Sequence, residues 1–489
     1  MGFKYCAKSS KDHITIFLIL CIALLISGFG IAQPNSFDVM SYQAVGDGIT
    51  DDSEAFLKSW AAVCGADPSA TPTLTIPSGK TFLLKPTKFY GPCKPQKINV
   101  EVSGSIVAPD SKSGYEGHNE WLSFKGIDGL NISGTGEIDG RGSVWWQKNT
   151  ALAFHCCNGL QLSGLKHMNS PKNHISINNC TEVIISLLNI TAPQNSPNTD
   201  GIDISASTHV LIRDSCIGTG DDCVAINSGS SFINITNVTC GPGHGISVGS
   251  LGENGAHHTV EEVHVNNCSF NGTMNGARIK TWQGGSGYAK NISFEQITLV
   301  SVKNPIIIDQ YYIDRNSPQN ATNVEVSNVT FIGFHGTTTS KNAITLKCCG
   351  SVGCTNIVLN QINITAVLES ETSSICSNAH GKATDFTAAP PPPPAAKEEE
   401  KLAEEGKKTE TGETPAPVPA PAKEKAEATE EAIAVASTPT KTEEPSRLET
   451  RDVAEPAPVE EVKEEKKERG DNNKTRFGIG TGRGTRSGS

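Results

Sequence analysis

Residues 181–186 read TEVIIS, residues 209–214 read HVLIRD and residues 232–237 read FINITN. Each is a short run of β-prone residues bounded by Asn, Asp, Ser or Thr, which is typical of a short strand. The starts of successive runs of this kind lie 22 to 33 residues apart, so the body of the chain is a repeat. The other runs are residues 129–134, 159–164, 261–267, 290–296, 322–328 and 355–361.

The sequence between these runs lacks the long amphipathic helices that an α/β sheet needs as crossovers. A β-sandwich would have hairpin turns at a closer spacing than this repeat. Short strands at a regular spacing without helices predict an all-β solenoid, a right-handed parallel β-helix. Residues 51–65, DDSEAFLKSWAAVCG, have the pattern of one amphipathic helix. Asp51 is a candidate N-cap, with Glu54 three residues later, and Gly65 is a candidate stop. We expect this helix to cap the N-terminal end of the solenoid.

The two ends of the chain differ in composition from its body. Lysines precede the apolar run ITIFLILCIALLI at residues 14–26, and small residues follow it, which predicts a secretory signal peptide over residues 1–32. A retained membrane anchor is the alternative. Residues 387–489 are rich in Pro, Ala, Glu and Lys and predict a disordered tail, either a fusion or a genuine extension that tethers the protein to a wall. The β-helix domain is therefore expected over residues 33–386.

Net charge limits the partners. The chain carries a formal charge of −11, and nothing in it indicates nucleic acid binding. Once the signal is removed, no remaining run approaches the roughly 18 apolar residues of a membrane-spanning helix. We expect a secreted monomer, with Asn-X-Ser/Thr sites available for glycans.

Polar residues recur at the interval of one coil. Asp200 precedes Asp221 by 21 residues, and Asp222 precedes His244 by 22. A similar strand follows each of them, so the polar residues should stack in space. The next strand carries two basic residues on one face because side chains alternate along a strand, and the residue between them should point into the core. The expected cluster on one outer face is Asp200, Asp221, Asp222, His244, Arg278 and Lys280.

Four segments carry a family resemblance: residues 196–204, SPNTDGIDI; residues 218–226, GTGDDCVAI; residues 240–252, CGPGHGISVGSLG; and residues 277–282, ARIKTW. In order and spacing they resemble the motif blocks of the polygalacturonases, glycoside hydrolase family 28. The resemblance extends over roughly residues 36 to 385 and is strongest to the exo-acting, pollen-type plant group. It implies a parallel β-helix that hydrolyses α-1,4-galacturonosyl bonds of de-esterified pectin and needs no cofactor or metal.

The resemblance also implies roles for the clustered residues. Asp221 would be the general acid of an inverting mechanism, Asp200 and Asp222 would hold the attacking water, and His244 would support the acid. Repulsion among the carboxylates would keep one proton on the cluster near neutral pH. Substrate binding would fall to Asn198, Arg278, Lys280 and Tyr312.

Two alternatives remain open at this point. A calcium-dependent pectate lyase has the same fold, although a calcium site does not favour His, Arg and Lys beside its carboxylates. A pectin-binding wall protein without activity is the other.

The sequence contains 15 cysteines. By resemblance Cys223 pairs with Cys240, and Cys349 with Cys354 and Cys64 with Cys93 are further candidate pairs. Buried free thiols are expected for Cys180, Cys216 and Cys268. Cys376 lacks the partner that the family has near the chain end and is the candidate unpaired thiol.

Overall fold

The computed structural model describes residues 35–111, 117–144, 146, 149–312, 323–367 and 371–386. All of them belong to the first of two compact units of the chain, residues 1–399. The predicted signal peptide and the predicted tail lie outside the described residues, and the boundaries proposed for them stay predictions. The same holds for the limits proposed for the β-helix domain.

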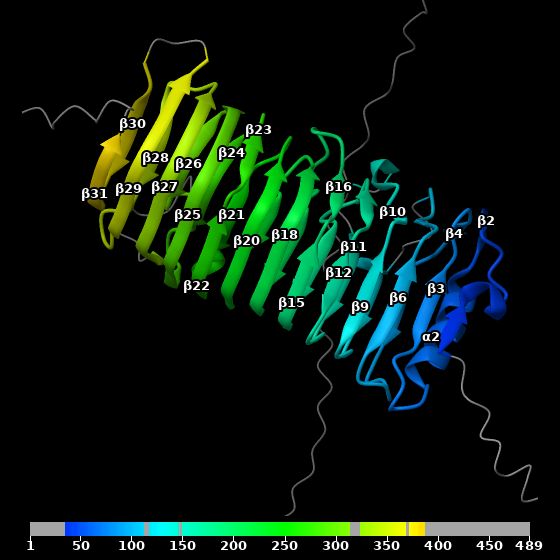
Figure 1. Cartoon of the computed structure of the whole chain (residues 1–489). Helices are drawn as coiled ribbons and strands as arrows, with labels where there is room; N and C mark the ends of the chain where they lie inside the picture. Colours follow the sequence, from blue (N-terminus) through cyan, green and yellow to red (C-terminus); the bar gives the residue numbers. More distant parts are fainter. Residues whose placement is uncertain are drawn as a thin grey trace, which may run out of the picture. The chain divides into compact units, whose positions relative to one another are not determined.

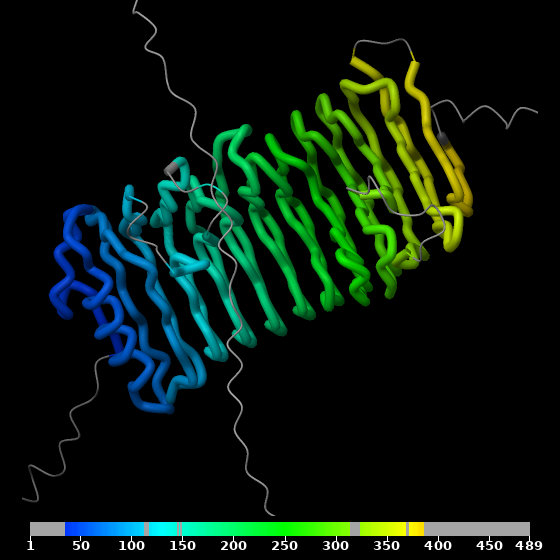
Figure 2. The backbone as a smooth tube through the Cα atoms, turned by 180° about the vertical axis from the view of Figure 1, so that it is seen from behind, coloured from blue at the N-terminus to red at the C-terminus, as the bar shows by residue number. Residues whose placement is uncertain are grey.

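The described part is a parallel β-helix, as predicted (Figure 1). Every strand pair in it is parallel, and each strand pairs with strands roughly one coil away in the sequence. The coils lie side by side in chain order, as the tube view from behind also shows (Figure 2). Because a coil rises by one strand spacing, residues 22 to 38 positions apart become neighbours.

One sheet has 11 strands and carries the candidate site. Its strands, in chain order, are β5 (Thr87–Tyr90), β8 (Glu120–Lys125), β11 (Thr150–His155), β14 (Ile175–Asn178), β17 (Ile202–Ser205), β19 (Val224–Ile226), β21 (Ile246–Leu251), β24 (Asn275–Thr281), β26 (Asn304–Asp309), β28 (Asn342–Lys347) and β30 (Ser373–Ser377).

The other sheet has 20 strands. Its early coils place two short strands in two separate rows, and long strands from β18 onward pair with both rows. The strands are β1 (Ser36–Asp38), β2 (Asp47–Asp51), β3 (Thr73–Ile76), β4 (Thr81–Leu83), β6 (Ile98–Val102), β7 (Ser105–Val107), β9 (Leu130–Gly134), β10 (Glu137–Asp139), β12 (Gln161–Ser163), β13 (Lys166–Met168), β15 (Thr181–Ser186), β16 (Asn189–Thr191), β18 (Thr208–Gly218), β20 (Ser230–Cys240), β22 (His257–Asn266), β23 (Ser269–Asn271), β25 (Ser286–Val302), β27 (Glu325–Thr338), β29 (Cys354–Ala366) and β31 (Ala379–Phe386).

The core is built from stacked apolar side chains, because the in-register pairing places like residues above one another. One such column runs through the 11-stranded sheet, and each of its members is at most 2% exposed. It consists of Ile177, Ile204, Ile226, Val248, Ile279, Ile308 and Leu346. Ile279 therefore points inward, as the alternation predicts, and its two basic neighbours point outward.

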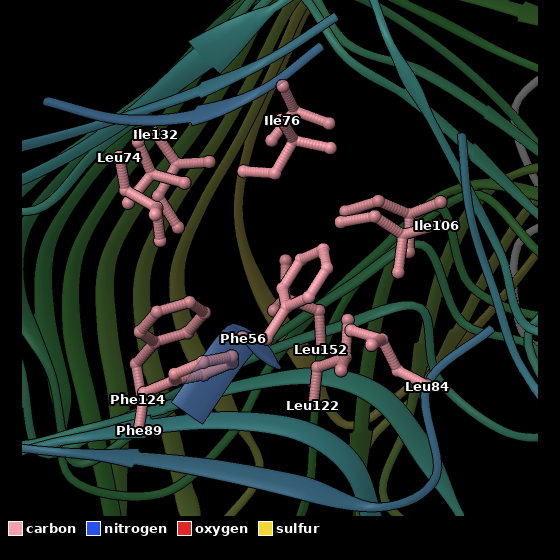
Figure 3. A pocket seen from close by; sticks show the side chains of 13 residues that line it. Phe56, Leu74, Ile76, Leu84, Phe89, Ile106, Leu122, Phe124, Ile132 and Leu152 are labelled. Atoms are coloured by element: carbon pink, nitrogen blue, oxygen red, sulfur yellow. The ribbon is translucent and has the colours of Figure 1, made fainter. Parts of the chain in front are cut away.

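A helix packs over the N-terminal end of the core. This helix, α2 (Ser53–Cys64), is the one α-helix among the described residues, which also contain the 3-10 segments η1 (Val39–Tyr42), η3 (Gly142–Val144) and η4 (Glu253–Gly255). Trp60 of α2 packs edge-on against Phe89 and Phe124, at ring distances of 5.5 and 5.7 Å. Phe56 also reaches the small, wholly apolar cavity inside the first coils (Figure 3). The predicted capping helix is confirmed.

The predicted N-cap of α2 is wrong by one residue. Asp52 occupies the N-cap position, and its carboxylate accepts hydrogen bonds from the amides of Val45 and Gly46 at 2.7 and 3.1 Å. Asp51 instead accepts from the Ser53 amide and hydroxyl. Gly65 ends the helix as expected.

One buried histidine interrupts the apolar columns of the 20-stranded sheet. His167 on β13 lies in register between Ile138 and Ile190, and neither ring nitrogen has a partner among the described residues. Burial, with a contribution from His174, lowers the pKa of His167 to about 3. The ring is therefore neutral in the folded protein at pH values where an unfolded chain, with a histidine pKa of about 6.5, begins to bind a proton.

His167→Leu is expected to raise the free energy of unfolding by about 1–2 kcal/mol at pH 7, because an unsatisfied polar ring is replaced by an apolar side chain. The gain should grow below pH 6.5. There the unfolded wild type binds a proton that the folded protein does not bind, so the free energy of unfolding of wild type falls as the pH falls toward the folded pKa of His167, whereas the leucine variant has no such loss. Denaturant unfolding at pH 7 and pH 5 measures both effects. His257→Leu at an exposed position of β22 is the control and should change stability little at either pH; an unchanged or lower stability for His167→Leu would contradict the expectation.

Candidate active site

The site is assembled at the turns that lead into β17, β19 and β21. Register pairs Ile202 with Val224 and Val224 with Ile246, and the residue two positions before each of them is polar. Backbone hydrogen bonds continue this register into the turns, from Gly201 to the Asp222 carbonyl and from Cys223 to the Gly245 carbonyl, both at 2.8 Å. The column that results consists of Asp200, Asp222 and His244. Asp222 thus takes the place beside Asp200 that the sequence interval had suggested for Asp221.

Two glycines allow the turns to approach each other. A side chain on Gly220 would lie 1.9 Å from the Ser196 carbonyl oxygen. Gly243 has a φ of 150°, and a side chain there would lie 2.7 Å from the Asp221 carbonyl oxygen. That same carbonyl accepts a 2.7 Å hydrogen bond from the His244 amide. The glycines beside the acidic pair and the histidine are therefore required by backbone packing.

Asp222 is fully buried and is held by two cations. Arg278 donates from Nη2 to Oδ1, and Lys280 donates from Nζ to Oδ2 at 2.8 Å. Ser247 completes the group, since its hydroxyl donates to Asp222 Oδ1 and accepts from Arg278 Nε, both at 2.8 Å. Strands β21 and β24 place Ser247 and Arg278 directly opposite each other. A charge so deeply buried is stable only with this pairing.

Asp221 forms a second pair with His244. Asp221 Oδ1 lies 2.8 Å from His244 Nδ1, and both side chains are partly exposed, at 19% and 27%. The Asp222 amide also donates to Asp221 Oδ1 at 2.8 Å. Burial alone would raise the pKa of Asp221, but the hydrogen bond and charge of His244 hold it below its ordinary value. Of the two adjacent aspartates, Asp221 is therefore the one that solvent can reach.

The crowding of carboxylates raises the proton affinity of Asp200. Burial is the main reason that the pKa of Asp200 lies well above its ordinary value, and the neighbouring charges of Asp203, Asp221 and Asp222 add to it. Repulsion was expected to keep one proton on the cluster. In the free protein the raised pKa belongs to Asp200, whereas the pKa of Asp221 is lowered.

The predicted substrate-binding residues lie around this cluster to different extents. Lys280 Nζ lies 5.3 Å from the centre of the Tyr312 ring, a cation–π contact, and Trp282 packs edge-on against the same ring at 6.2 Å. Asn198 is exposed in the turn before Asp200 and has a φ of 55°, a conformation that Asn tolerates well. Arg278 and Lys280 are about one-tenth exposed and contact Asp222.

Sequence reasoning missed two polar residues of this face. Ser247 and Asp203 both lie in register with the position of Arg278, across Ala225. Alternation along each strand was a sufficient signal, because Asp203 stands between the inward-pointing Ile202 and Ile204 just as Arg278 stands between Ala277 and Ile279.

The ligand atoms of Asp221, Asp222 and His244 lie within 4.8 Å of one another, a grouping that a cation could share. In this structure the Asp222 oxygens already contact two cations of the protein itself, Arg278 and Lys280. The arrangement can offer a solvent-accessible acid beside a histidine, a second carboxyl of raised pKa, and two fixed positive charges.

The disulfides support the site and correct one prediction. Cys223–Cys240 joins the residue after Asp222 to the end of β20, and Cys64–Cys93 ties α2 to the loop after β5, both as expected. The third disulfide is Cys348–Cys354, not Cys349–Cys354. Cys348 and Cys349 both lie buried in the turn after β28, and the path of that turn brings Cys348 to Cys354.

One prediction about the free cysteines is wrong. Cys180 and Cys268 are buried and free, as predicted, but Cys216 is exposed because it points outward between the buried Ser215 and Ile217. Cys376 is free and exposed. It is one of seven free cysteines among the described residues, the others being Cys156, Cys157, Cys180, Cys216, Cys268 and Cys349.

Comparison with known proteins places the chain in a family. Residues 66–386 match the model of glycosyl hydrolases family 28. A probable polygalacturonase of Arabidopsis thaliana is 50% identical over 362 residues, which are 72% of this chain and 79% of the relative. A polygalacturonase of Persea americana is 41% identical over 370 residues, with 72% and 79% covered. The crystal structure of the endo-xylogalacturonan hydrolase from Aspergillus tubingensis matches in fold, with a TM-score of 0.62 at 24% identity, over 71% of this chain and 98% of that one. With a family model that spans most of its β-helix and relatives at this identity, the chain belongs to family 28 of the glycosyl hydrolases.

Proposed function

We propose that this protein is a secreted polygalacturonase that hydrolyses α-1,4-galacturonosyl bonds of de-esterified pectin. The observation that carries the proposal is the pairing within one face of an accessible acid, Asp221 with His244, and a buried carboxylate, Asp222 with Arg278 and Lys280. Glycoside hydrolysis needs both a proton donor and carboxylates that activate water, and an anionic sugar needs positive charge nearby. The printed names of the two plant relatives agree with this activity.

In the proposed inverting mechanism Asp221 is the general acid, Asp200 and Asp222 hold the attacking water, and Asp222 accepts its proton. His244 holds the Asp221 carboxyl in place through the 2.8 Å contact at Nδ1. The pKa of Asp221 is lowered in the free protein, so the acid needs help to retain its proton. A bound galacturonate anion supplies that help, because a nearby negative charge favours the neutral carboxyl.

Substrate recognition is assigned to the residues around this centre. Arg278 and Lys280 supply the positive charge for the sugar carboxylate, while Tyr312 covers Lys280 and Asn198 offers its amide from the preceding turn. The same two cations neutralise Asp222 in the free protein, which keeps them at the site before substrate arrives.

The finer assignments are part of the same proposal. They are exo action, an extracellular location in the cell wall and a monomeric state. None of the helices in the described ranges combines the length and the apolar character needed to cross a membrane. The plant relatives support a cell-wall substrate, and exo action rests on the likeness of the motif blocks to the pollen-type group.

Purified full-length protein is expected to release reducing ends from polygalacturonate with no metal added, without forming the unsaturated product that a lyase makes. The assay follows reducing sugar and the absorbance of unsaturated sugars, with and without EDTA. Monomer as the first product indicates exo action, whereas a rapid fall in viscosity indicates endo action. Loss of activity in EDTA together with unsaturated product would establish the lyase instead. Binding of polygalacturonate without any release of reducing ends would establish a wall-binding protein.

A further inference from the structure

Asp203 is a fourth carboxyl on the face that carries the proposed site. It lies on β17 between Ile202 and Ile204, both fully buried in the core, so its side chain points to the outer face. Register places it opposite Ala225 on β19, and Ala225 lies opposite Ser247 on β21. Ser247 is the residue that donates to Asp222. Asp203 therefore belongs to the same array of outward side chains as the groups around Asp222.

The Asp203 carboxyl has no partner of its own within the described part of the chain. Its Oδ1 is buried and makes no hydrogen bond, although the residue as a whole is half-buried. Arg278 and Lys280 are both engaged by Asp222, and Lys172 acts on Asp203 through its charge, without a recorded ion pair or hydrogen bond within the described ranges. A buried carboxylate oxygen without a hydrogen bond is costly. Protonation lowers that cost because it removes the charge, and a ligand can supply the missing partner.

We propose that Asp203 is a substrate-binding residue that works as the neutral acid and donates a hydrogen bond from its carboxyl to an oxygen of a bound galacturonosyl unit. The proposal rests on the polygalacturonase function above and adds a contact to it. A neutral carboxyl can donate to a hydroxyl or carboxylate oxygen of the sugar, whereas an ionised carboxylate would repel the sugar carboxylate. Ala225, the neighbour of Asp203 on β19, is small and buried.

The charged groups around Asp203 favour the neutral form. Burial raises the pKa of Asp203 to about 7, and Asp222 and Asp221, at the turn into β19, add to the shift. Lys172, before β14, and Lys280, on β24, oppose it. Asp203 acts in turn on Asp200, in the turn before β17, because its charge adds to the rise in the pKa of Asp200. Asp203 is therefore protonated at pH 5 and ionised at pH 8, while a sugar carboxylate with a pKa of about 4 is ionised throughout.

The test compares the affinity of tetragalacturonate for full-length wild type, Asp203→Asn and Asp203→Ala by calorimetry at pH 5 and pH 8. Asparagine keeps a donor at every pH, so Asp203→Asn is expected to bind about 3-fold more weakly than wild type at pH 5 and about 3-fold more tightly at pH 8. Between pH 5 and pH 8 the affinity of wild type should therefore fall about 10-fold relative to the affinity of Asp203→Asn. A factor of this size is the effect of one hydrogen bond to a charged group. Asp203→Ala should bind about 10-fold more weakly than wild type at pH 5 and similarly to it at pH 8.

Asp214→Asn on β18 of the other sheet is the matched control and should keep the wild-type ratio between pH 5 and pH 8. A ratio of Asp203→Asn to wild-type affinity that is the same at both pH values overturns the inference. Wild type that neither binds nor cleaves overturns the proposed function as well, so the two failures are distinguishable. Should Asp203→Asn fail to fold, Asp203→Ala decides: the same ratio of its affinity to the wild-type affinity at pH 5 and at pH 8 contradicts the inference.

Discussion

Asp221→Asn is expected to lower kcat on polygalacturonate by about 10²–10⁴-fold, because an amide cannot give a proton to the leaving oxygen and general acid catalysis contributes a factor of this size. The amide oxygen can still accept from His244 and from the Asp222 amide, so the local geometry should persist. The positive charges of Arg278 and Lys280 also remain. KM should therefore change by much less than kcat.

The measurement is steady-state kinetics on wild type and variant, with circular dichroism and thermal unfolding to show that both are folded. Asp214→Asn changes a partly exposed carboxylate of β18 that is paired with Arg213, and it should leave kcat unchanged. A folded Asp221→Asn enzyme with wild-type kcat would assign the proton donor to another group, and the raised pKa of Asp200 makes that residue the next candidate.

Arg278→Met is expected to lower the free energy of unfolding by about 3 kcal/mol, the lower part of the range for breaking a buried ion pair. Asp222 is fully buried, and Arg278 contacts it directly and through Ser247. Lys280 and Ser247 still satisfy part of the carboxylate, which is why the loss should not reach the upper end of the range. Activity should fall as well, because both the substrate charge and the position of Asp222 depend on this arginine.

Urea unfolding of wild type, Arg278→Met, Asp222→Asn and the double variant measures the coupling. Asp222→Asn removes the carboxylate but leaves Lys280, about one-tenth exposed, without its anion, so the double variant should regain little of the lost stability and the two single losses should not add. Arg213→Met removes a partner from the exposed pair with Asp214 and should cost less than about 1 kcal/mol. Equal losses for Arg278→Met and Arg213→Met would mean that the buried pair contributes no more than a surface pair.

Much of the fold could be predicted because the features that define a parallel β-helix appear as short-range patterns in the sequence. The repeat length, the alternation around Ile279 and the amphipathic residues 53–64 each act over a few positions, and each is confirmed. The errors are of one residue. Asp52 rather than Asp51 is the N-cap, and Cys348 rather than Cys349 forms the disulfide. Such errors arise because register within a coil depends on how the turn packs, which a sequence interval does not specify.

The sequence by itself determined that Asp200, Asp221, Asp222, His244, Arg278 and Lys280 share one face, because one-coil intervals and strand alternation are enough to place them there. It also determined the family to which the chain belongs, through four motif blocks. Only the tertiary structure decided which of these side chains contact each other. Asp222 is buried and contacts Arg278 and Lys280, whereas Asp221 contacts His244 and is partly exposed to solvent. It likewise decided that Asp200 and Asp203 hold protons more tightly. The physical reason is that ion pairing and proton affinity depend on burial and on distances between coils, and neighbours in the sequence such as Asp221 and Asp222 can differ completely in both.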